Sequence, residues 1–182
     1  MPQASRSCFL IVDVQNLLIE EVSYFKCEML DTIKRFLVFC RTNSIEVVYV
    51  RHESKNGVLK KDTEPWQIYH EVAPIQGEKI FDKHRSSSFY QTGLKEHLRE
   101  KGIETIIIAG METGFCINAT VQAGFEHGFE MLILKSGHTA GDYDAPLMSA
   151  ERSVAYHNKL WDGRFGTVLS VEDLEMLFNG RQ

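Results

Sequence analysis

The sequence predicts a three-layer α/β/α fold built on a mainly parallel, doubly wound sheet of about six strands. Short apolar runs of strand length alternate along the chain with segments whose apolar residues repeat at helical spacing. The strand-length runs are apolar on both sides, which is typical of parallel strands that helices cover on both faces. The 182 residues, of which 43% are hydrophobic, are enough for one sizeable core. We therefore expect a single domain over residues 1–182.

Three strands are expected in the first half of the chain, at residues 8–14 (CFLIVDV), 45–50 (IEVVYV) and, more weakly, 78–82 (EKIFD). A helix is predicted over residues 28–42, because its apolar residues fall on one face: Met29, Ile33, Phe36, Leu37 and Cys40. A shorter amphipathic helix over residues 92–102 is expected to end at Gly102.

The second half of the chain opens with the clearest strand, TIIIAG at residues 105–110. The residues after Cys116 suit a helix that ends near Gly128, because Ala119, Ala123 and Phe125 lie at helical spacing. The remaining pattern alternates strand and helix, with strands at 129–135 and 166–170 and helices at 148–161 and 171–178.

The charge balance argues against nucleic acid or membrane partners. The formal net charge is −5 and the isoelectric point is near 5.8, so the chain lacks the basic character that a phosphate backbone or an anionic membrane requires. A small-molecule or protein partner is therefore expected. No apolar run approaches the roughly 20 residues that span a bilayer, and the opening MPQASRSCFLIVDVQ does not resemble a signal peptide. We expect a cytoplasmic protein.

The cysteines are predicted to be free thiols. None of the four forms a CxxC pair or has a companion histidine at zinc-finger spacing. They are Cys8, Cys27, Cys40 and Cys116.

Three polar residues lie at the expected carboxyl ends of strands, where ligands bind in open parallel sheets. They are Asp13, Lys83 and Cys116. Each has an ordinary alternative, which is a turn residue for the aspartate, a solvated charge for the lysine and a core thiol for the cysteine. Cys116 differs from a core thiol by its place at a strand-to-helix turn. There, unpaired N–H groups and the helix dipole are expected to lower the thiol pKa and to supply donors for an oxyanion.

Three segments carry a family resemblance: IVDVQ, FDKHRSSSFYQTGL and IIIAGMETGFCINATVQAGFEHGFEMLIL. In this order they closely resemble the isochorismatase-like cysteine hydrolase family, which includes nicotinamidases, N-carbamoylsarcosine amidohydrolases and ureide hydrolases. The resemblance runs from Phe9 to the SAERSVAYHN helix and the strand beyond it. Each motif is weak alone, but the three together at strand ends are specific.

The resemblance implies a catalytic triad of Asp13, Lys83 and Cys116. It also implies a cis Met111–Glu112 peptide bond and an oxyanion hole formed by the backbone N–H groups of Glu112 and Cys116. The thiolate would attack a carbonyl or ureido carbon, an amine or ammonia would leave, and water would hydrolyse the thioester. The aspartate can carry the protons, and the lysine offsets negative charge. We therefore expect hydrolysis of a C–N bond in a small amide, ureide or carbamoyl compound.

Two departures from the family bear on metal and substrate. Nicotinamidases carry a metal-binding D-x-H motif after the second strand, and His52 and Ser54 stand at those positions here. We therefore expect no metal and no other cofactor, and nicotinamide is a poor first candidate for the substrate. His52, Glu53 and His70 could form a different metal site, but such residues in a polar loop are more often solvated. Glu112 is also unusual for the family, and either selects a cationic or donor-rich substrate or is solvated.

The connection over residues 52–78 is longer than structureless loops usually are in a compact domain. Its apolar side chains are not expected to face water together. These side chains form either a satellite core on the third strand, or a pocket wall or subunit contact. The resemblance favours the second alternative, since family members commonly form dimers or larger homo-oligomers.

The expected pocket residues are Gln15, Trp66, Phe89 and Phe115, although aromatic residues near strand ends are more often part of the core. The segment HTAGDYDAP at residues 138–146 either adds to the rim of the pocket or forms a plain turn.

A different class of function is possible on the same fold. The chain could be a non-catalytic oligomeric scaffold, or a thiol redox sensor in which Cys116 is oxidised. Asp13 and Lys83 beside the cysteine favour hydrolysis, because neither a scaffold nor a core thiol needs a buried ion pair.

Overall fold

The computed structural model of the protein describes residues 2–22, 24–55, 57–142 and 147–180. Within these residues it contains a six-stranded sheet in the order β3-β2-β1-β4-β5-β6, and every neighbouring pair of strands is parallel. The predicted α/β fold with a six-stranded, doubly wound sheet is confirmed.

The strands are β1 (Ser7–Val12), β2 (Glu46–His52), β3 (Lys79–Lys83), β4 (Thr105–Met111), β5 (Glu130–Thr139) and β6 (Thr167–Leu169). The α-helices are α1 (Asn16–Glu21), α2 (Lys26–Thr42), α3 (Leu94–Glu100), α4 (Asn118–Glu126), α5 (Ala150–Trp161) and α6 (Val171–Asn179). A π-helical turn, Thr113–Ile117, precedes α4.

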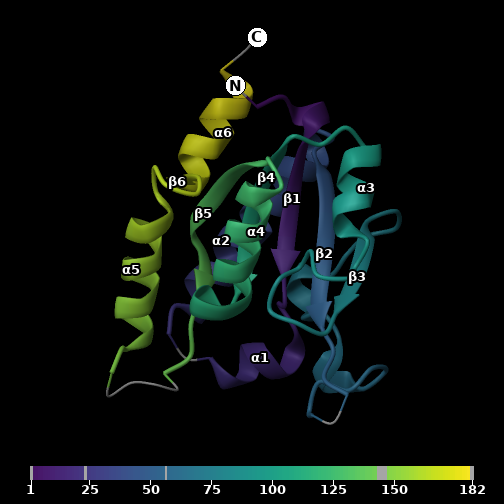
Figure 1. The fold of residues 1–182 in the computed structure, drawn as a ribbon, viewed down its shortest axis with the longest axis vertical. Helices are drawn as coiled ribbons and strands as arrows, with labels where there is room; N and C mark the ends of the chain where they lie inside the picture. Colours follow the sequence, from purple (N-terminus) through teal and green to yellow (C-terminus); the bar gives the residue numbers. More distant parts are fainter. Residues whose placement is uncertain (1, 23, 56, 143–146, 181–182) are drawn as a thin grey trace.

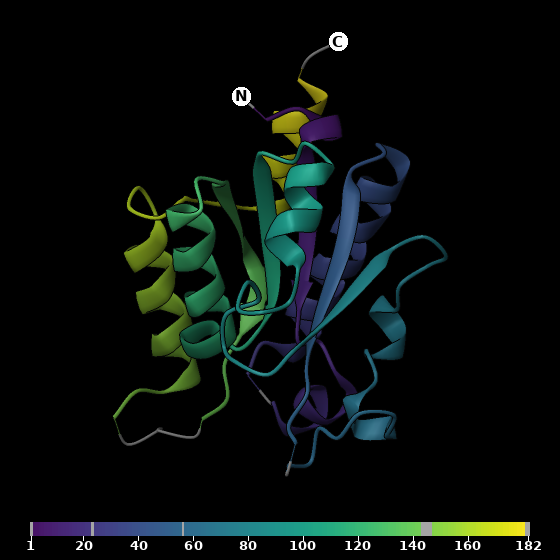
Figure 2. The same cartoon turned by 45° about the vertical axis from the view of Figure 1, so that its right-hand side comes forward.

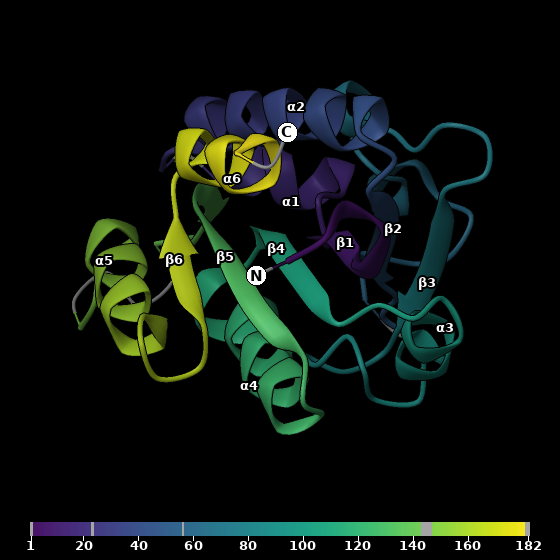
Figure 3. The same ribbon diagram turned by 90° about the horizontal axis from the view of Figure 1, so that it is seen from above.

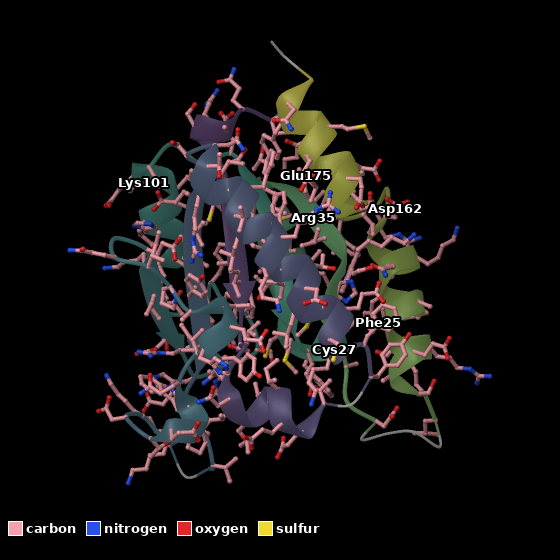
Figure 4. All side chains as sticks on the ribbon, turned by 180° about the vertical axis from the view of Figure 1, so that it is seen from behind. Phe25, Cys27, Arg35, Lys101, Asp162 and Glu175 are labelled. Carbon is pink, nitrogen blue, oxygen red and sulfur yellow. The ribbon has the colours of Figure 1, made fainter. Side chains whose placement is uncertain are left out.

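Helices cover both faces of the sheet and form two hydrophobic cores. Helices α1, α2 and α6 lie on one face, and α3, α4 and α5 lie on the other (Figures 1 and 3). Strands β1 and β4 are buried along their whole length, which explains their uninterrupted apolar sequences. On the first face, Arg35 of α2 also forms a bidentate ion pair with Glu175 of α6 (Figure 4).

The carboxyl ends of the central strands meet at one edge of the sheet, the lower edge in Figure 1. The chain leaves β1 toward β2 by way of α2 on one face, and leaves β3 toward β4 by way of α3 on the other. The winding direction therefore reverses between β1 and β4, where a crevice for ligands is expected. Helix α1 and the β2–β3 connection pass beneath this edge (Figures 1 and 2).

The largest difference from the predicted elements is the length of β5. The predicted strand ends at Lys135, but β5 continues to Thr139 even though Ser136 and Gly137 have the composition of a turn. The register between β4 and β5 shifts after Ile108, so the continued strand pairs again beside the site. The rest of the HTAGDYDAP segment includes residues 143–146, which lie outside the described residues.

Helix α1 was not predicted, because six residues carry too little periodicity and only Ile19 among them is buried. None of the helices in the described ranges is both long and apolar enough to cross a membrane.

Candidate active site

Asp13 leaves the end of β1 in an unusual backbone conformation. Its φ is +54°, in the left-handed region that aspartate tolerates better than most residues. Its N–H donates to the carbonyl oxygen of Val50 on β2 at 2.8 Å, so the turn is tied to the neighbouring strand. The side chain is thereby held at the carboxyl edge of the sheet, where it is 1% exposed.

Lys83, the last residue of β3, joins the other two candidate residues. Its Nζ lies 2.7 Å from Oδ2 of Asp13 and donates to Sγ of Cys116 at 3.0 Å. A third bond goes to the carbonyl oxygen of Arg85 at 3.1 Å. The structure therefore brings together the three residues that the sequence placed at separate strand ends. The lysine is not the solvated charge that its sequence context alone favours, since its side chain is fully buried.

The ammonium group of Lys83 is stabilised by its neighbours. Burial alone would lower its pKa, but the carboxylate of Asp13 and the sulfur of Cys116 together raise the pKa above the usual value for lysine. With Asp13 ionised, the charges of the lysine and the carboxylate cancel when Cys116 carries its proton.

The Cys116 thiol holds its proton more tightly than an ordinary cysteine does. Burial, followed by the negative charge of Asp13, raises the pKa of Cys116 to about 12 and outweighs the opposite effect of Lys83. The expected lowering of this pKa by a helix N-terminus is therefore wrong. One reason is local geometry, because the cysteine lies in the π-helical turn before α4 and not in the first turn of the α-helix. The group needs a base before it can attack, and it is accessible, since it is only partly buried.

Asp13 is placed to be that base. Its second carboxylate oxygen, Oδ1, is buried and accepts no well-formed hydrogen bond from the described residues. Carboxylate oxygens have several acceptor sites, so Oδ1 is available to a proton from the thiol or from a departing nitrogen.

The turn that carries Cys116 begins with a cis peptide bond between Met111 and Glu112, as expected. The carbonyl oxygen of Glu112 accepts hydrogen bonds from the N–H groups of Phe115 and Ile117, both at 3.1 Å. These bonds close the turn around the cysteine. The oxyanion hole made by the N–H groups of Glu112 and Cys116 stays a prediction.

A buried hydrogen-bond network that the sequence did not reveal holds this turn. Nδ1 of His138 lies 2.9 Å from Oγ1 of Thr113, and Nε2 lies 3.0 Å from Oδ1 of Asn158 on α5. The asparagine oxygen can only accept, so the proton is on Nε2 and the threonine hydroxyl donates to Nδ1. The first residue of the turn is thereby fixed to β5 and to α5. The only sequence signal was a histidine four residues after the apolar run that ends at Leu134.

Acidification is expected to weaken the fold through His138. Burial lowers the pKa of this histidine to about 4, below its ordinary value of 6.5, so the unfolded chain binds the proton more tightly. The resulting stability, up to about 3 kcal/mol, is fully present above pH 6.5 and is lost as the pH falls through 4. Urea unfolding at pH 7 and pH 4 measures this difference. The His138→Gln variant should lack this pH-dependent loss of stability. If both proteins lost the same free energy of unfolding between pH 7 and pH 4, the effect would not come from His138.

The four expected pocket residues differ in burial and in their contacts. Gln15 is fully buried and its amide is occupied, because Oε1 accepts from the N–H of His52 and Nε2 donates to the carbonyl oxygens of His52 and Trp66. Gln15 therefore supports the backbone beside the site, and its amide is not free to bind a substrate. The ring of Trp66 is buried under the guanidinium of Arg51, 3.4 Å from the ring centre.

The prediction for Phe89 is wrong, because its ring stacks on Phe129 in the hydrophobic core. Phe129 precedes β5, at the opposite edge of the sheet from Cys116, so Phe89 is drawn away from the site. Phe115 is 56% exposed and lines a cavity of about 180 Å³ together with Glu112 and Met148. The triad does not line this cavity.

The 52–78 connection packs on the loop that follows Asp13. The N–H of Tyr69 donates to the carbonyl oxygen of Val14, and Gln15 forms an isolated antiparallel bridge with Ile68. Val72 is part of the core between the sheet and helix α2, and Ile68 and Tyr69 pack against that core. The apolar residues therefore extend the main core, which is closer to the satellite-core alternative.

His52 and Ser54, at the positions of the nicotinamidase metal ligands, form other contacts. The hydroxyl oxygen of Ser54 accepts the N–H of Leu59 at 3.2 Å, and Nδ1 of His52 lies 3.4 Å from Nζ of Lys83. Within the described ranges, no three or more His, Cys, Asp or Glu residues are arranged to hold a metal ion. These residues do not fit the metal site of nicotinamidases.

The sequence matches the family described as the isochorismatase domain over residues 7–173. It is 28% identical over 136 residues to the secreted isochorismatase effector Isc1 of Verticillium dahliae, across 74% of this chain and 70% of that protein. It is also 28% identical over 102 residues to the ureidoacrylate amidohydrolase RutB of Methylorubrum extorquens, across 56% of this chain and 41% of that protein.

Solved structures show the same fold. A cysteine hydrolase from Pseudomonas syringae pv. phaseolicola 1448A is similar with a TM-score of 0.88 at 20% identity, covering 97% of this chain and 94% of its own. The N-carbamoylsarcosine amidase of Thermoplasma acidophilum is similar with a TM-score of 0.79 at 18% identity, covering 92% and 97%. At these identities the likeness establishes the fold alone.

Proposed function

This chain belongs to the isochorismatase family of hydrolases, and on that premise we propose that it cleaves a C–N bond of a small amide, ureide or carbamoyl compound with Cys116 as the nucleophile. The observation that carries the proposal is the buried contact of Lys83 with both Oδ2 of Asp13 and Sγ of Cys116, at 2.7 and 3.0 Å.

In the first half of the reaction, Asp13 takes the proton of the Cys116 thiol and the sulfur attacks the carbonyl carbon. The N–H groups of Glu112 and Cys116 stabilise the oxyanion. The C–N bond then breaks, and Asp13 returns the proton to the departing nitrogen, which leaves as ammonia or an amine. The product is a thioester on Cys116.

In the second half, water hydrolyses the thioester. Asp13 accepts a proton from the attacking water, the C–S bond breaks, and the sulfur regains its proton. Throughout both halves Lys83 keeps its charge, since its pKa is raised, and it holds Asp13 by their ion pair.

The names of two relatives support the substrate class. Ureidoacrylate and N-carbamoylsarcosine both contain a ureido or carbamoyl group, and the proteins named for them are similar to this chain in sequence or in fold. We extend this class to the present protein as part of the proposal. The proposal also includes a small-molecule substrate and a homo-oligomeric assembly. A cytoplasmic location belongs to it as well, although one relative is named as secreted.

The scaffold and redox-sensor alternatives have less support. Removing two charges from water is costly, so a buried ion pair such as Asp13–Lys83 is a poor device for stability alone. A sensor usually has a second cysteine to form a disulfide, but Cys8 and Cys40 are buried core residues and Cys27 is exposed at the start of α2.

The proposal is tested by measuring ammonia release from a panel of amides, ureides and carbamoyl compounds. We expect at least one compound to be hydrolysed by the native protein and by Cys27→Ala, which removes an exposed thiol. Cys116→Ala should abolish the reaction, and a chelator should leave it unchanged. Release that survives Cys116→Ala would refute the nucleophile, and activity that is lost on chelation and restored by zinc or iron would refute metal independence.

A further inference from the structure

Lys83 and Gln15 fix the position of His52 at the active site. It is the last residue of β2 and pairs in register with Lys83 on β3. Residues that pair in this way on parallel strands point to the same face of the sheet. The side-chain amide of Gln15 binds both the N–H and the carbonyl oxygen of His52, at 2.8 and 3.0 Å. The imidazole therefore has a defined position beside the lysine.

The ammonium group of Lys83 has more acceptors around it than hydrogens to donate. It carries three N–H bonds. Four acceptors surround it: Oδ2 of Asp13 at 2.7 Å, Sγ of Cys116 at 3.0 Å, the Arg85 carbonyl oxygen at 3.1 Å and Nδ1 of His52 at 3.4 Å. The three nearer atoms use the three hydrogens. Nδ1 of His52 is thus a surplus acceptor while Cys116 is unmodified.

This balance changes when Cys116 is acylated. The sulfur of a thioester cannot become a thiolate and shares its electrons with the carbonyl group, so it accepts a hydrogen bond from Lys83 less well than the sulfur of the free protein, which shares a proton with Asp13. One N–H of a buried lysine would then lack a partner, which is unfavourable. We propose that His52 accepts the hydrogen bond that the acylated Cys116 gives up, and so holds the Lys83–Asp13 pair in place while water attacks the thioester. This role rests on the proposed hydrolase function and makes His52 a positioning residue for its second half.

The role requires a neutral imidazole with its proton on Nε2. Four titratable groups face His52: Lys83 on β3, Asp13 after β1, and Glu53 and His84 in the segments after β2 and β3. Burial is the main cause that lowers the pKa of His52, and the charge of Lys83 adds to it. The neutral form is therefore favoured at neutral pH, and acidification would place a second cation beside the lysine.

The first test needs no substrate. Iodoacetamide converts the sulfur of Cys116 to a thioether, which like the thioester cannot become a thiolate acceptor for Lys83. The alkylation is done in a Cys27→Ala background that removes the exposed thiol. NMR of histidine labelled with ¹⁵N then follows the His52 titration, assigned by the signal that is missing in His52→Asn. We expect alkylation to lower the pKa of His52 by about one unit or more, a tenfold change in proton affinity. The proposal would be overturned if alkylation left the pKa of His52 unchanged. It would also be overturned if alkylation lowered this pKa equally in the Lys83→Met variant.

The second test separates the two halves of the reaction with p-nitrophenyl acetate. In His52→Asn the amide oxygen replaces Nδ1 as an acceptor, and His52→Leu is the matched variant without one. For the leucine variant we expect the initial burst of nitrophenol to be kept and the following steady rate to fall about tenfold, while asparagine retains most of that rate. Equal losses in both variants, or a burst lost together with the steady rate, would overturn the role. Absence of hydrolysis in the amide panel would instead count against the proposed function.

Discussion

Replacing Asp13 with Asn is expected to lower the pKa of the Cys116 thiol and at the same time to abolish hydrolysis. The carboxylate is the main charge that raises this pKa, and the Lys83 ammonium stays 3.0 Å from the sulfur when the carboxylate is removed. The thiolate therefore becomes easier to form. Hydrolysis should nevertheless fall by at least about a hundredfold, because no group remains to protonate the leaving nitrogen or to activate water.

Alkylation of Cys116 by iodoacetamide across a pH range measures the first effect, and ammonia release measures the second. Lys83→Met should act in the opposite direction on the thiol, raising its pKa and slowing alkylation, because the charge that stabilises the thiolate is lost. Asp13 and Cys116 would then be a coupled pair that shares one proton. If Asp13→Asn stopped alkylation in a folded protein, the shared proton would be ruled out, and Asp13 would be an obligatory base.

Gly110→Ala is expected to destabilise the protein by more than about 3 kcal/mol, because the new methyl group would collide with the backbone of β1. Gly110 has φ of +125°, which side chains rarely adopt, and a Cβ there would fall on the carbonyl oxygen of Val12. The residue pairs with Val12 on β1 and with His138 on β5, so neither neighbour can move without opening the centre of the sheet.

Gly102→Ala is the matched control. Gly102 also has a positive φ, of +69°, but no atom lies within 4 Å of a Cβ at that position. Its substitution should cost only about 1 kcal/mol, from backbone conformation alone. The free energies of unfolding in urea compare the two variants. Similar losses would mean that conformation, and not the contact with Val12, decides the effect at Gly110.

Much of the fold could be predicted from local pattern. Strands β1 and β4 are buried on both sides, so their sequences are apolar throughout, and helix α2 turns one apolar face to the sheet. These patterns arise from backbone periodicity and burial, which act over a few residues. The same patterns placed Asp13, Lys83 and Cys116 at the carboxyl ends of their strands, because a polar residue at the end of an apolar run marks where the strand ends.

What the sequence by itself determined was therefore the class of fold and the three residues at one edge of the sheet. Only the tertiary structure decided that Lys83 contacts both partners, that the pKa of Cys116 is raised, that Phe89 belongs to the core and that His52 adjoins the lysine. These properties depend on which strands are neighbours and on how much water the packed side chains exclude. Residues far apart in the chain determine both the strand order and the exclusion of water. A pKa responds to burial and nearby charge, so these properties cannot be predicted from local periodicity.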